Sequence, residues 1–523
     1  MDKYYHHLRF DVRKVQEYIF RVPKLKYMLG ANSSIGELFS KELIGLMPQV
    51  DSIFNNYPGD LPAEIKKLLD KNILSSAGGH FEAVFDSKDK LDDFAKNVSA
   101  CVREKTPGLE VSMSSRKFLM SDNWKDFYEE RKSYPLSAPN TDAVFIDAPF
   151  YQLCNNDGQS IGMNGDKGEI LGSMAKRMSE QADDFYKLKS TDAISTFYQD
   201  MKVSACRVPK ELGELSDTGV SLKRNMLAYI KADGNGTGAR FNVLSKSIDS
   251  MNIQNAFVEI EKFWYESRTS MMKLLEEATR TYIDNSEKYK KLPFILLMLG
   301  GDDLFMVSTP EIALDIAKII AKPDIENVSV SVGIAFVKET YPVASASAIA
   351  EMCLESAKAA GYAQKLETDK NIIPYIDWHV HFDSVYQHLK DIRRASYMLN
   401  YKDGKDEMIE ILSKRPYRSE ELSLILKQVK AIAKKLDKSM DKKKTDNEIA
   451  NNKIKTYRSA LKNGYRDLEY LRERLMQDDP LLNEFLVYEK PVDGIRLDAS
   501  LDKIELIDFY RTPMKEGAQS DQD

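Results

Sequence analysis

Three aspartates offer the clearest chemistry in this sequence. Asp302 and Asp303 lie in Leu299-Gly-Gly-Asp-Asp-Leu304 between two apolar runs, and Asp233 opens the stretch Asp233-Gly-Asn-Gly-Thr-Gly238. Unpaired carboxylates beside buried strands resist desolvation, so we expect a cation to balance them. Mg²⁺ or Mn²⁺ fits, because these hard cations bind carboxylate oxygens and share their coordination with substrate phosphates. An isolated Gly-Gly-Asp-Asp is more often an exposed turn facing water, so the rest of the chain must decide.

Glycines beside these acids form a phosphate-binding pattern. Gly300 and Gly301 precede the acidic pair, and a missing Cβ lets a triphosphate approach the backbone closely. Gly234 and Asn235 follow Asp233 between an expected strand and an expected helix, where backbone amides and a helix N-terminus bind phosphates. These four residues are therefore candidate nucleotide-binding positions.

Lys358 is a further candidate nucleotide-binding residue. It lies in Glu355-Ser-Ala-Lys-Ala-Ala-Gly361, on a helix expected after an alternating strand. A lysine there could reach a triphosphate. A solvated surface lysine explains the residue equally well from the sequence alone.

The order of the predicted elements should bring the acids together. We expect a strand over 226–232, a helix over 253–283, hairpin strands over 294–299 and 304–307, a helix over 310–321 and a strand over 328–337. In a ferredoxin-like fold the first strand lies beside the hairpin, so Asp233 should lie within metal-bridging distance of Asp302. Such a site suits two-metal nucleotidyl transfer, in which one ion lowers the pKa of the attacking hydroxyl and the other stabilises the leaving pyrophosphate.

The same order of elements occurs earlier in the chain. Asp11 and His80 are 69 residues apart, as are Asp233 and Asp302, and Asp93-Phe-Ala-Lys96 lies 222 residues before Asp315-Ile-Ala-Lys318. Asp11 and Asp233, His80 and Asp302, and the two four-residue segments are thus each 222 residues apart, and this shared offset indicates an internal repeat. We predict two β-α-α-β-β-α-β units, each an antiparallel sheet with helices on one face, the architecture of a polymerase palm domain.

The two copies differ where chemistry would occur. The first has Gly78-Gly79-His80-Phe81 and thus no carboxylate at the hairpin. We expect His80 to be neutral, and the first copy to have lost metal binding and kept a structural role.

The predicted fold class is therefore α+β, with two ferredoxin-like palm domains, a linker domain and a helical C-terminal domain. The expected boundaries are a degenerate first palm over 1–115, the linker over 116–215, a GGDEF-like second palm over 216–378, and the helical domain over 379–523. The polar tail after Phe509 should be disordered.

Composition limits the partners. A net charge of -6 with 30% charged residues describes a mildly acidic, soluble protein without general attraction to nucleic acid. Residues 427–462 hold twelve Lys and Arg against four Asp and Glu; such a run could contact RNA, but it is more often the solvated face of a helix pair. No apolar run is long enough for a membrane span and no signal peptide is evident, so we expect a cytoplasmic protein.

Histidine and cysteine give weaker signals. His379 and His381 alternate in a strand-like segment and could chelate a metal, yet with no further His or Cys nearby a structural role is the better interpretation. The four cysteines contain no Cys-x-x-Cys pair, which argues against a zinc ribbon and against a disulfide framework.

These motifs resemble a known family. Phe10-Asp-Val-Arg-Lys-Val-Gln-Glu-Tyr-Ile-Phe20 and Lys24-Leu-Lys-Tyr-Met-Leu-Gly-Ala31 resemble the start of the first palm in the large polymerase/cyclase subunit of type III CRISPR effector complexes. Segments that resemble its second palm follow in the family's order: Tyr229–Gly238, Gly300–Asp303, Ser331–Ile334, Ala357–Lys358 and Ile376–His379. The resemblance covers roughly 1–115 and 205–385.

The resemblance implies a cyclic oligoadenylate synthase that uses ATP and two Mg²⁺ or Mn²⁺ ions in antiviral defence, with target RNA as the activator. Asp233, Asp302 and Asp303 would be the catalytic, metal-binding acids of the second palm. Other type III effector subunits, guide RNA and target RNA would be the partners.

Two departures from the family narrow this prediction. The first palm starts at once and no His-Asp dipeptide occurs, so the HD nuclease domain of many members is not expected, and the family's zinc-binding cysteine pairs are missing. We expect either a trimmed subunit of a Cmr-like complex or a free-standing relative. The alternative function is a catalytically silent double-palm scaffold in an RNA-guided complex.

Overall fold

The computed structural model has a mixed fold of helices and sheets. It describes residues 3–49, 52–54, 61–127, 154, 156, 163–164, 170–223, 225–285, 291–322, 329–368, 372–381, 388–403, 406–440, 495–497 and 499–512. The chain divides into two compact units, one of residues 1–212, 236–276 and 296–305, the other of residues 213–235, 277–295 and 306–523. No helix in the described ranges is both long enough and apolar enough to cross a bilayer.

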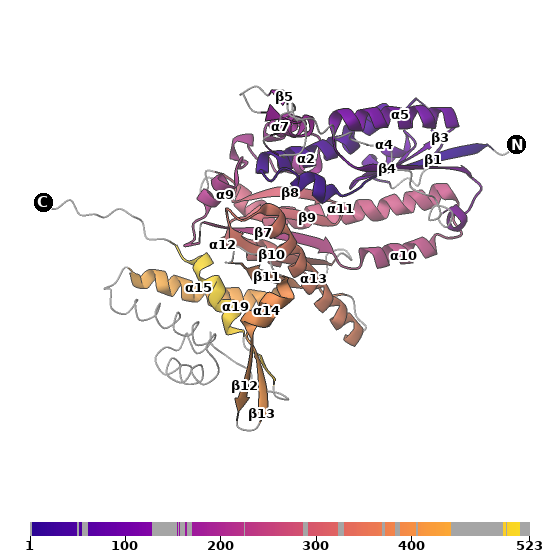
Figure 1. The fold of residues 1–523 in the computed structure, drawn as a ribbon. Helices are drawn as coiled ribbons and strands as arrows, with labels where there is room; N and C mark the ends of the chain where they lie inside the picture. The colour runs from indigo at the N-terminus through magenta and orange to yellow at the C-terminus, as the bar shows by residue number, and fades with distance from the viewer. Residues whose placement is uncertain are drawn as a thin grey trace, which may run out of the picture. The chain divides into compact units, whose positions relative to one another are not determined.

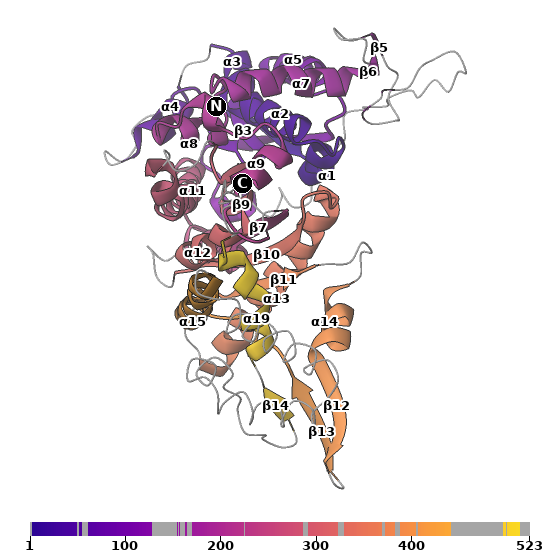
Figure 2. The same ribbon diagram turned by 90° about the vertical axis from the view of Figure 1, so that its left-hand side faces the viewer.

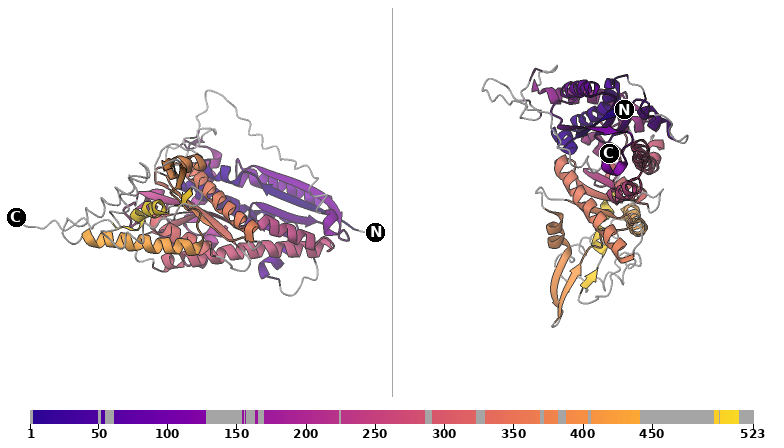
Figure 3. Two further views of the ribbon diagram at one scale, coloured as in Figure 1. Left: turned by 90° about the horizontal axis from the view of Figure 1, so that it is seen from below. Right: turned by 90° about the vertical axis from the view of Figure 1, so that its right-hand side faces the viewer.

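A four-stranded antiparallel sheet forms the centre of the first unit. Its strands are β1 (Tyr4–Val12), β2 (Ile73–Ala77), β3 (His80–Phe85) and β4 (Val111–Leu119), in the order β2-β3-β1-β4. These strands, indigo to purple, run side by side in Figure 3. β4 pairs with β1 along its whole length.

Helices of the first unit pack through regularly spaced apolar residues. α5 (Lys88–Lys105) buries Leu91, Phe94, Val98 and Val102, a spacing that places them on one helix face. Phe94 lies against Phe81 and Phe85 of the sheet. The other helices in this part of the chain are α1 (Val15–Phe20), α2 (Leu25–Glu37), α3 (Leu43–Leu46) and α4 (Ala63–Leu69), with a π-helical turn over Leu38–Glu42.

The segment expected as a linker domain contributes helices to the first unit. α7 (Ser173–Tyr186) lies against α2, where a Cβ on Gly30 would overlap the carbonyl oxygen of Met178. Asp192 caps α8 (Ala193–Asp200) and accepts a hydrogen bond from Ser33. A short hairpin, β5 (Met163–Asn164) and β6 (Ile170–Leu171), precedes α7, and most of 128–169 lies outside the described residues.

A five-stranded sheet carries the three aspartates. Its strands are β7 (Met226–Gly234), β8 (Phe294–Gly300), β9 (Asp303–Ser308), β10 (Val330–Lys338) and β11 (Ile376–Val380), in the order β11-β10-β7-β9-β8. β10 is antiparallel to β7 and parallel to β11, and Figure 1 shows these three strands together. The helices near these strands in sequence are α9 (Leu212–Thr218), α10 (Thr237–Ser247), α11 (Ile253–Asp284), α12 (Pro310–Ile320) and α13 (Val343–Thr368).

The two sheets share one strand order. The order β2-β3-β1-β4 of the first matches β8-β9-β7-β10 of the second, with β11 added at the edge. β1 covers residues 4–12 and β7 covers 226–234, so the 222-residue offset applies to both ends of these strands. We refer to the two sheets and their helices as the first and second repeats.

A third sheet lies within the C-terminal segment that we expected to be helical. β12 (Met398–Asp403), β13 (Asp406–Ile411) and β14 (Ile495–Leu497) form it (Figure 2). The helices of this segment are α14 (Leu389–Tyr397), α15 (Ser419–Met440) and α19 (Ser500–Tyr510). Most of the basic stretch 427–462 lies outside the described residues. Of the tail after Phe509 that we expected to be disordered, Tyr510 is the last residue of α19, and residues 513–523 lie outside the described residues.

Candidate active site

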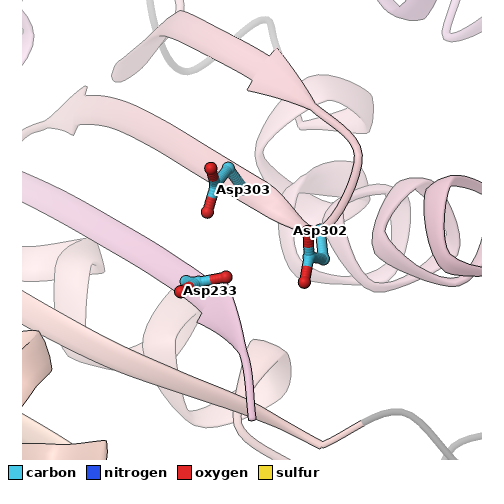
Figure 4. A group of neighbouring side chains, drawn as sticks. All are labelled: Asp233, Asp302 and Asp303. Atoms are coloured by element: carbon cyan, nitrogen blue, oxygen red, sulfur yellow. The ribbon is translucent and has the colours of Figure 1, made fainter. Parts of the chain in front are cut away.

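Strand pairing brings the three predicted acids together. Asp233 lies near the end of β7, Asp302 lies in the turn between β8 and β9, and Asp303 begins β9 (Figure 4). Each offers a carboxylate oxygen that lies within 4.8 Å of those of the other two. Asp233 and Asp302 are half-buried and Asp303 is exposed. Three hard oxygen donors at this spacing suit Mg²⁺ or Mn²⁺.

The turn between β8 and β9 depends on glycine. Gly301 has φ of +67°, a left-handed conformation that costs glycine nothing and other residues free energy. A Cβ placed on Gly300 or Gly301 would have no other protein atom within 4 Å. The backbone of the hairpin is therefore approachable from outside, as the phosphate-binding prediction requires.

Asp302 is held by the first turn of α10. The hydroxyl of Thr237 donates a hydrogen bond to Oδ2 of Asp302 over 2.5 Å. Thr237 opens α10, whose N-cap is Gly236 with φ of +68°. The N-terminus of this helix thus lies beside the acidic group, and helix N-termini favour anions such as phosphate.

Lys358 contacts one of the acids directly. Its ammonium group, on α13, forms an ion pair with Oδ2 of Asp233. α13 lies close to β10 because Gly333 has no side chain, and a Cβ there would collide with the backbone of Ala350 and Leu354. Partial burial lowers the pKa of Lys358, whereas the ion pair favours the charged ammonium.

Gly234 and Asn235 take different positions from the glycines of the hairpin. Gly234 is buried at the end of β7, paired with Val330. Asn235 is also buried, and its side-chain amide donates a hydrogen bond to the hydroxyl of Ser329 over 2.8 Å. In this structure Asn235 fastens the end of β7 to the strand that follows residue 329.

A cavity of about 550 Å³ opens beside the acidic hairpin within the first unit. Its wall includes Gly300, Gly301, Asp302 and Asp303 from the hairpin, Phe241, Trp264, Glu261 and Arg268 from α10 and α11, and Arg9, Asp11, His80 and Glu82 from the first repeat. The sequence did not identify the α10 and α11 residues, although Phe241 follows the glycine-rich stretch by one helical turn.

The first repeat has a hydrogen-bonded charge network where the second has acids. Nδ1 of His80 lies 2.6 Å from Asp11 and Nε2 lies 2.6 Å from Glu82. Arg9 donates two hydrogen bonds to Asp11, of 2.6 and 3.0 Å, and His7 contacts the other oxygen of Glu82 at 2.9 Å. Both ring nitrogens of His80 therefore face carboxylates, which requires both to donate.

This geometry corrects the expectation of a neutral His80. Burial alone would lower the pKa of His80, but the charge of Glu82 and the hydrogen bonds to Asp11 and Glu82 outweigh it and raise the pKa. Burial likewise works to raise the pKa of Asp11, and the hydrogen bonds from His80 and Arg9 overcome it and lower that pKa to about 2. These contacts favour the protonated imidazolium of His80, which carries its positive charge at the first hairpin.

His379 and His381 are both buried. Burial, followed by the nearby charges of Arg415 and Arg393, lowers the pKa of His379 to about 2. Within the described part of the chain, neither histidine belongs to a group of side chains that could share a metal ion.

Solved structures resemble this chain, although no family model matches its sequence and no curated protein matches it. A chain of the Csm1-Csm4 cassette crystallised in complex with cA4 matches with a TM-score of 0.53 and 13% identity, over 97% of this chain and 70% of that chain. This protein shares the fold of that chain. The apo Csm1-Csm4 cassette gives a TM-score of 0.48 at 14% identity, over 97% and 70% of the two chains. The Csm1-Csm4 subcomplex in the type III-A CRISPR-Csm interference complex gives 0.45 at 13% identity, over 97% and 70%.

The match to the Csm1-Csm4 cassette with cA4 covers nearly all of this chain, and hence both repeats and the C-terminal segment. At 13% identity it establishes the fold and leaves residue roles to be argued from this chain's own geometry. The fold agrees with the predicted resemblance to type III CRISPR subunits. The narrower prediction of a Cmr-like subunit without an HD domain stays a prediction.

Proposed function

We propose that this protein is a nucleotidyltransferase that makes a cyclic oligoadenylate-type second messenger from ATP by two-metal catalysis. The observation that carries the proposal is the convergence of Asp233, Asp302 and Asp303 within 4.8 Å of one another beside an open glycine turn. A scaffold has no need to hold three carboxylates together, because their mutual repulsion disfavours the folded state. The related fold, crystallised in complex with cA4, supports the same chemistry.

Each residue of the site has a role in this proposal. Asp233, Asp302 and Asp303 would hold the divalent ions, and such ions would lower the pKa of the attacking hydroxyl and neutralise charge on the phosphates. Thr237 fixes the orientation of Asp302 through its 2.5 Å hydrogen bond. The exposed backbone of Gly300 and Gly301 accommodates the triphosphate.

Lys358 has two positions in the proposed cycle. Without ligands it neutralises Asp233. A cation held by Asp233 would compete with the ammonium of Lys358, which could then contact a phosphate oxygen, where positive charge stabilises the charge that develops in the transition state. Gly234 and Asn235 act indirectly, because their pairing with Val330 and hydrogen bond to Ser329 hold the end of β7, which carries Asp233.

We further propose that the two repeats are a degenerate first palm and a catalytic second palm of a type III CRISPR effector subunit, located in the cytoplasm. Its partners would be other effector subunits and guide RNA, with target RNA as the activator. The alternative is a catalytically silent scaffold. In the first repeat, His80 pairs with Asp11 and Glu82, which fits a structural role for that repeat. The second repeat instead has Asp302 and Asp303 at the equivalent hairpin, which supports an enzyme.

Product analysis separates the two functions. Labelled ATP is incubated with the protein, Mn²⁺ and candidate guide and target RNAs, alone and with effector subunits, and the products are resolved by thin-layer chromatography. We expect a metal-dependent oligoadenylate product. Absence of product under every condition, with a folded protein, would support the scaffold.

A further inference from the structure

Two stacked aromatic rings face the cavity beside the acidic hairpin. Phe241 on α10 and Trp264 on α11 have ring centroids 5.5 Å apart and an angle of 25° between their planes. Both rings are half-buried and both line the cavity. Core rings of the same unit, such as Phe118 and Phe127, are at most 2% exposed. The pair therefore has aromatic surface that the protein core does not fully cover.

The position of Phe241 follows from the hydrogen bond at the start of α10. Thr237 contacts Asp302, and Phe241 lies four residues later on the same helix. Residues four apart share a helix face, about 6 Å apart along the axis. Phe241 thus lies about one helical turn from the residue whose hydroxyl contacts Asp302, and both Phe241 and Asp302 line the cavity.

We propose that Phe241 and Trp264 form a stacking surface for the base of the nucleotide whose phosphates lie at the acidic hairpin. This inference rests on the proposed function and adds the residues that select a nucleotide over a bare polyphosphate. Aromatic rings stack on the flat face of a nucleobase, and the hairpin at the other end of the wall favours cations and phosphates. A cavity of about 550 Å³ is in the size range of small-ligand sites.

Phe263 provides a matched comparison within the same aromatic cluster. Its ring lies 5.9 Å from Phe241 and 5.0 Å from Trp264, and Arg240 lies over it at 5.3 Å. Phe263 is also half-buried, but it does not line the cavity. If the rings serve only to pack α10 against α11, loss of any of the three should have similar effects.

The test measures binding of ATP and of inorganic triphosphate to the full-length protein in Mn²⁺, by isothermal titration calorimetry. Triphosphate contains the phosphates without the base. We expect Phe241→Ala and Trp264→Ala to weaken ATP binding on the order of tenfold and to leave triphosphate binding nearly unchanged. Phe263→Ala should retain wild-type affinity for both ligands, and Trp264→Phe should retain most of the ATP affinity.

The outcomes distinguish this inference from the proposed function. Equal loss of ATP and triphosphate binding, or unchanged ATP binding in both alanine variants, would overturn the stacking surface while the nucleotide site stands. If the wild-type protein binds neither ligand in Mn²⁺, the proposed function fails and the stacking surface fails with it. Melting curves of each variant establish that the protein measured is folded.

Discussion

Lys358 and Asp233 form an ion pair between α13 and β7 at the centre of the acidic group. The side chains are 23% and 29% exposed, so both charges can exchange this contact for water or a ligand. A metal ion at Asp233 must compete with the ammonium for the same carboxylate. Metal binding at Asp233 would thus free the ammonium of Lys358 to contact the phosphates.

Replacing Lys358 should therefore change metal and nucleotide binding in opposite directions. Partly exposed ion pairs contribute up to about 1 kcal/mol, so Lys358→Gln should raise Mn²⁺ affinity about two- to fivefold in the absence of nucleotide. The KM for ATP should rise on the order of tenfold, because a charge-assisted hydrogen bond to phosphate is lost. Calorimetry with Mn²⁺ alone and initial rates against ATP concentration measure the two effects.

Lys365→Gln is the control for this prediction, because Lys365 is exposed on the same helix. It should leave both quantities unchanged. Mn²⁺ affinity that falls in Lys358→Gln would show that the ammonium does not compete for Asp233.

His80→Ala should destabilise the protein in a pH-dependent way. Removing one partner of a buried charge network leaves Asp11 and Glu82 facing each other, at a cost on the order of 2–3 kcal/mol. The folded-state pKa of His80 is raised above its usual value of 6.5, so its contribution is fully present below pH 6.5 and is lost as pH rises through the folded-state pKa. Melting temperatures of wild type and variant at pH 6 and pH 9 should differ more at pH 6.

Metal-dependent turnover of His80→Ala, measured below its melting temperature, should stay near that of wild type, because the first repeat lacks the acids. A loss of turnover as large as that caused by mutating Asp302 would mean that both repeats contribute catalytic groups. A melting difference that is the same at both pH values would contradict the protonated state of His80.

Gly300→Ala should impair nucleotide binding without harming the fold. A Cβ at Gly300 meets no protein atom within 4 Å, so we expect an unchanged or slightly higher melting temperature. The methyl group would occupy the space that the triphosphate needs, and the KM for ATP should rise at least about tenfold. Gly45→Ala, whose Cβ is equally uncrowded, should change neither quantity, and normal ATP kinetics in Gly300→Ala would place the phosphates elsewhere.

The sequence was sufficient to predict the features that residue spacing determines. The strand expected over 226–232 starts where β7 starts and stops two residues short of its end at Gly234, because a run of apolar residues that stops at Asp and Gly is typical of a buried strand. The convergence of Asp233 and Asp302 followed from the strand order, since adjacent strands bring their ends together.

The sequence was insufficient to predict side-chain contacts that depend on packing between distant parts of the chain. Asn235 lies in the glycine-rich stretch, yet its amide turns to Ser329, a choice set by how β7 meets β10. The charge of His80 depends on Glu82 lying two residues further on the same strand face and on Asp11 lying opposite in β1. Trp264 lines the cavity because of the orientation of α11 about its own axis. The sequence pattern of this 32-residue helix does not specify that orientation.

In the proposed function, Asp302 and Asp303 hold the catalytic metal ions. The Asp302→Asn/Asp303→Asn variant keeps the shape of both side chains and removes two charges, so without metal it should melt no lower than wild type. Added Mn²⁺ should raise its melting temperature less than that of wild type, because ligand-induced stabilisation follows affinity.

The most direct test is the amount of product that this double variant forms from labelled ATP with Mn²⁺ under conditions that activate the wild-type protein. We predict a loss on the order of 10³-fold with an intact fold, because the carboxylates hold the ions that neutralise charge on the reacting phosphates. A variant that keeps wild-type product formation and the full Mn²⁺-induced shift in melting temperature would show that Asp302 and Asp303 are ordinary turn residues.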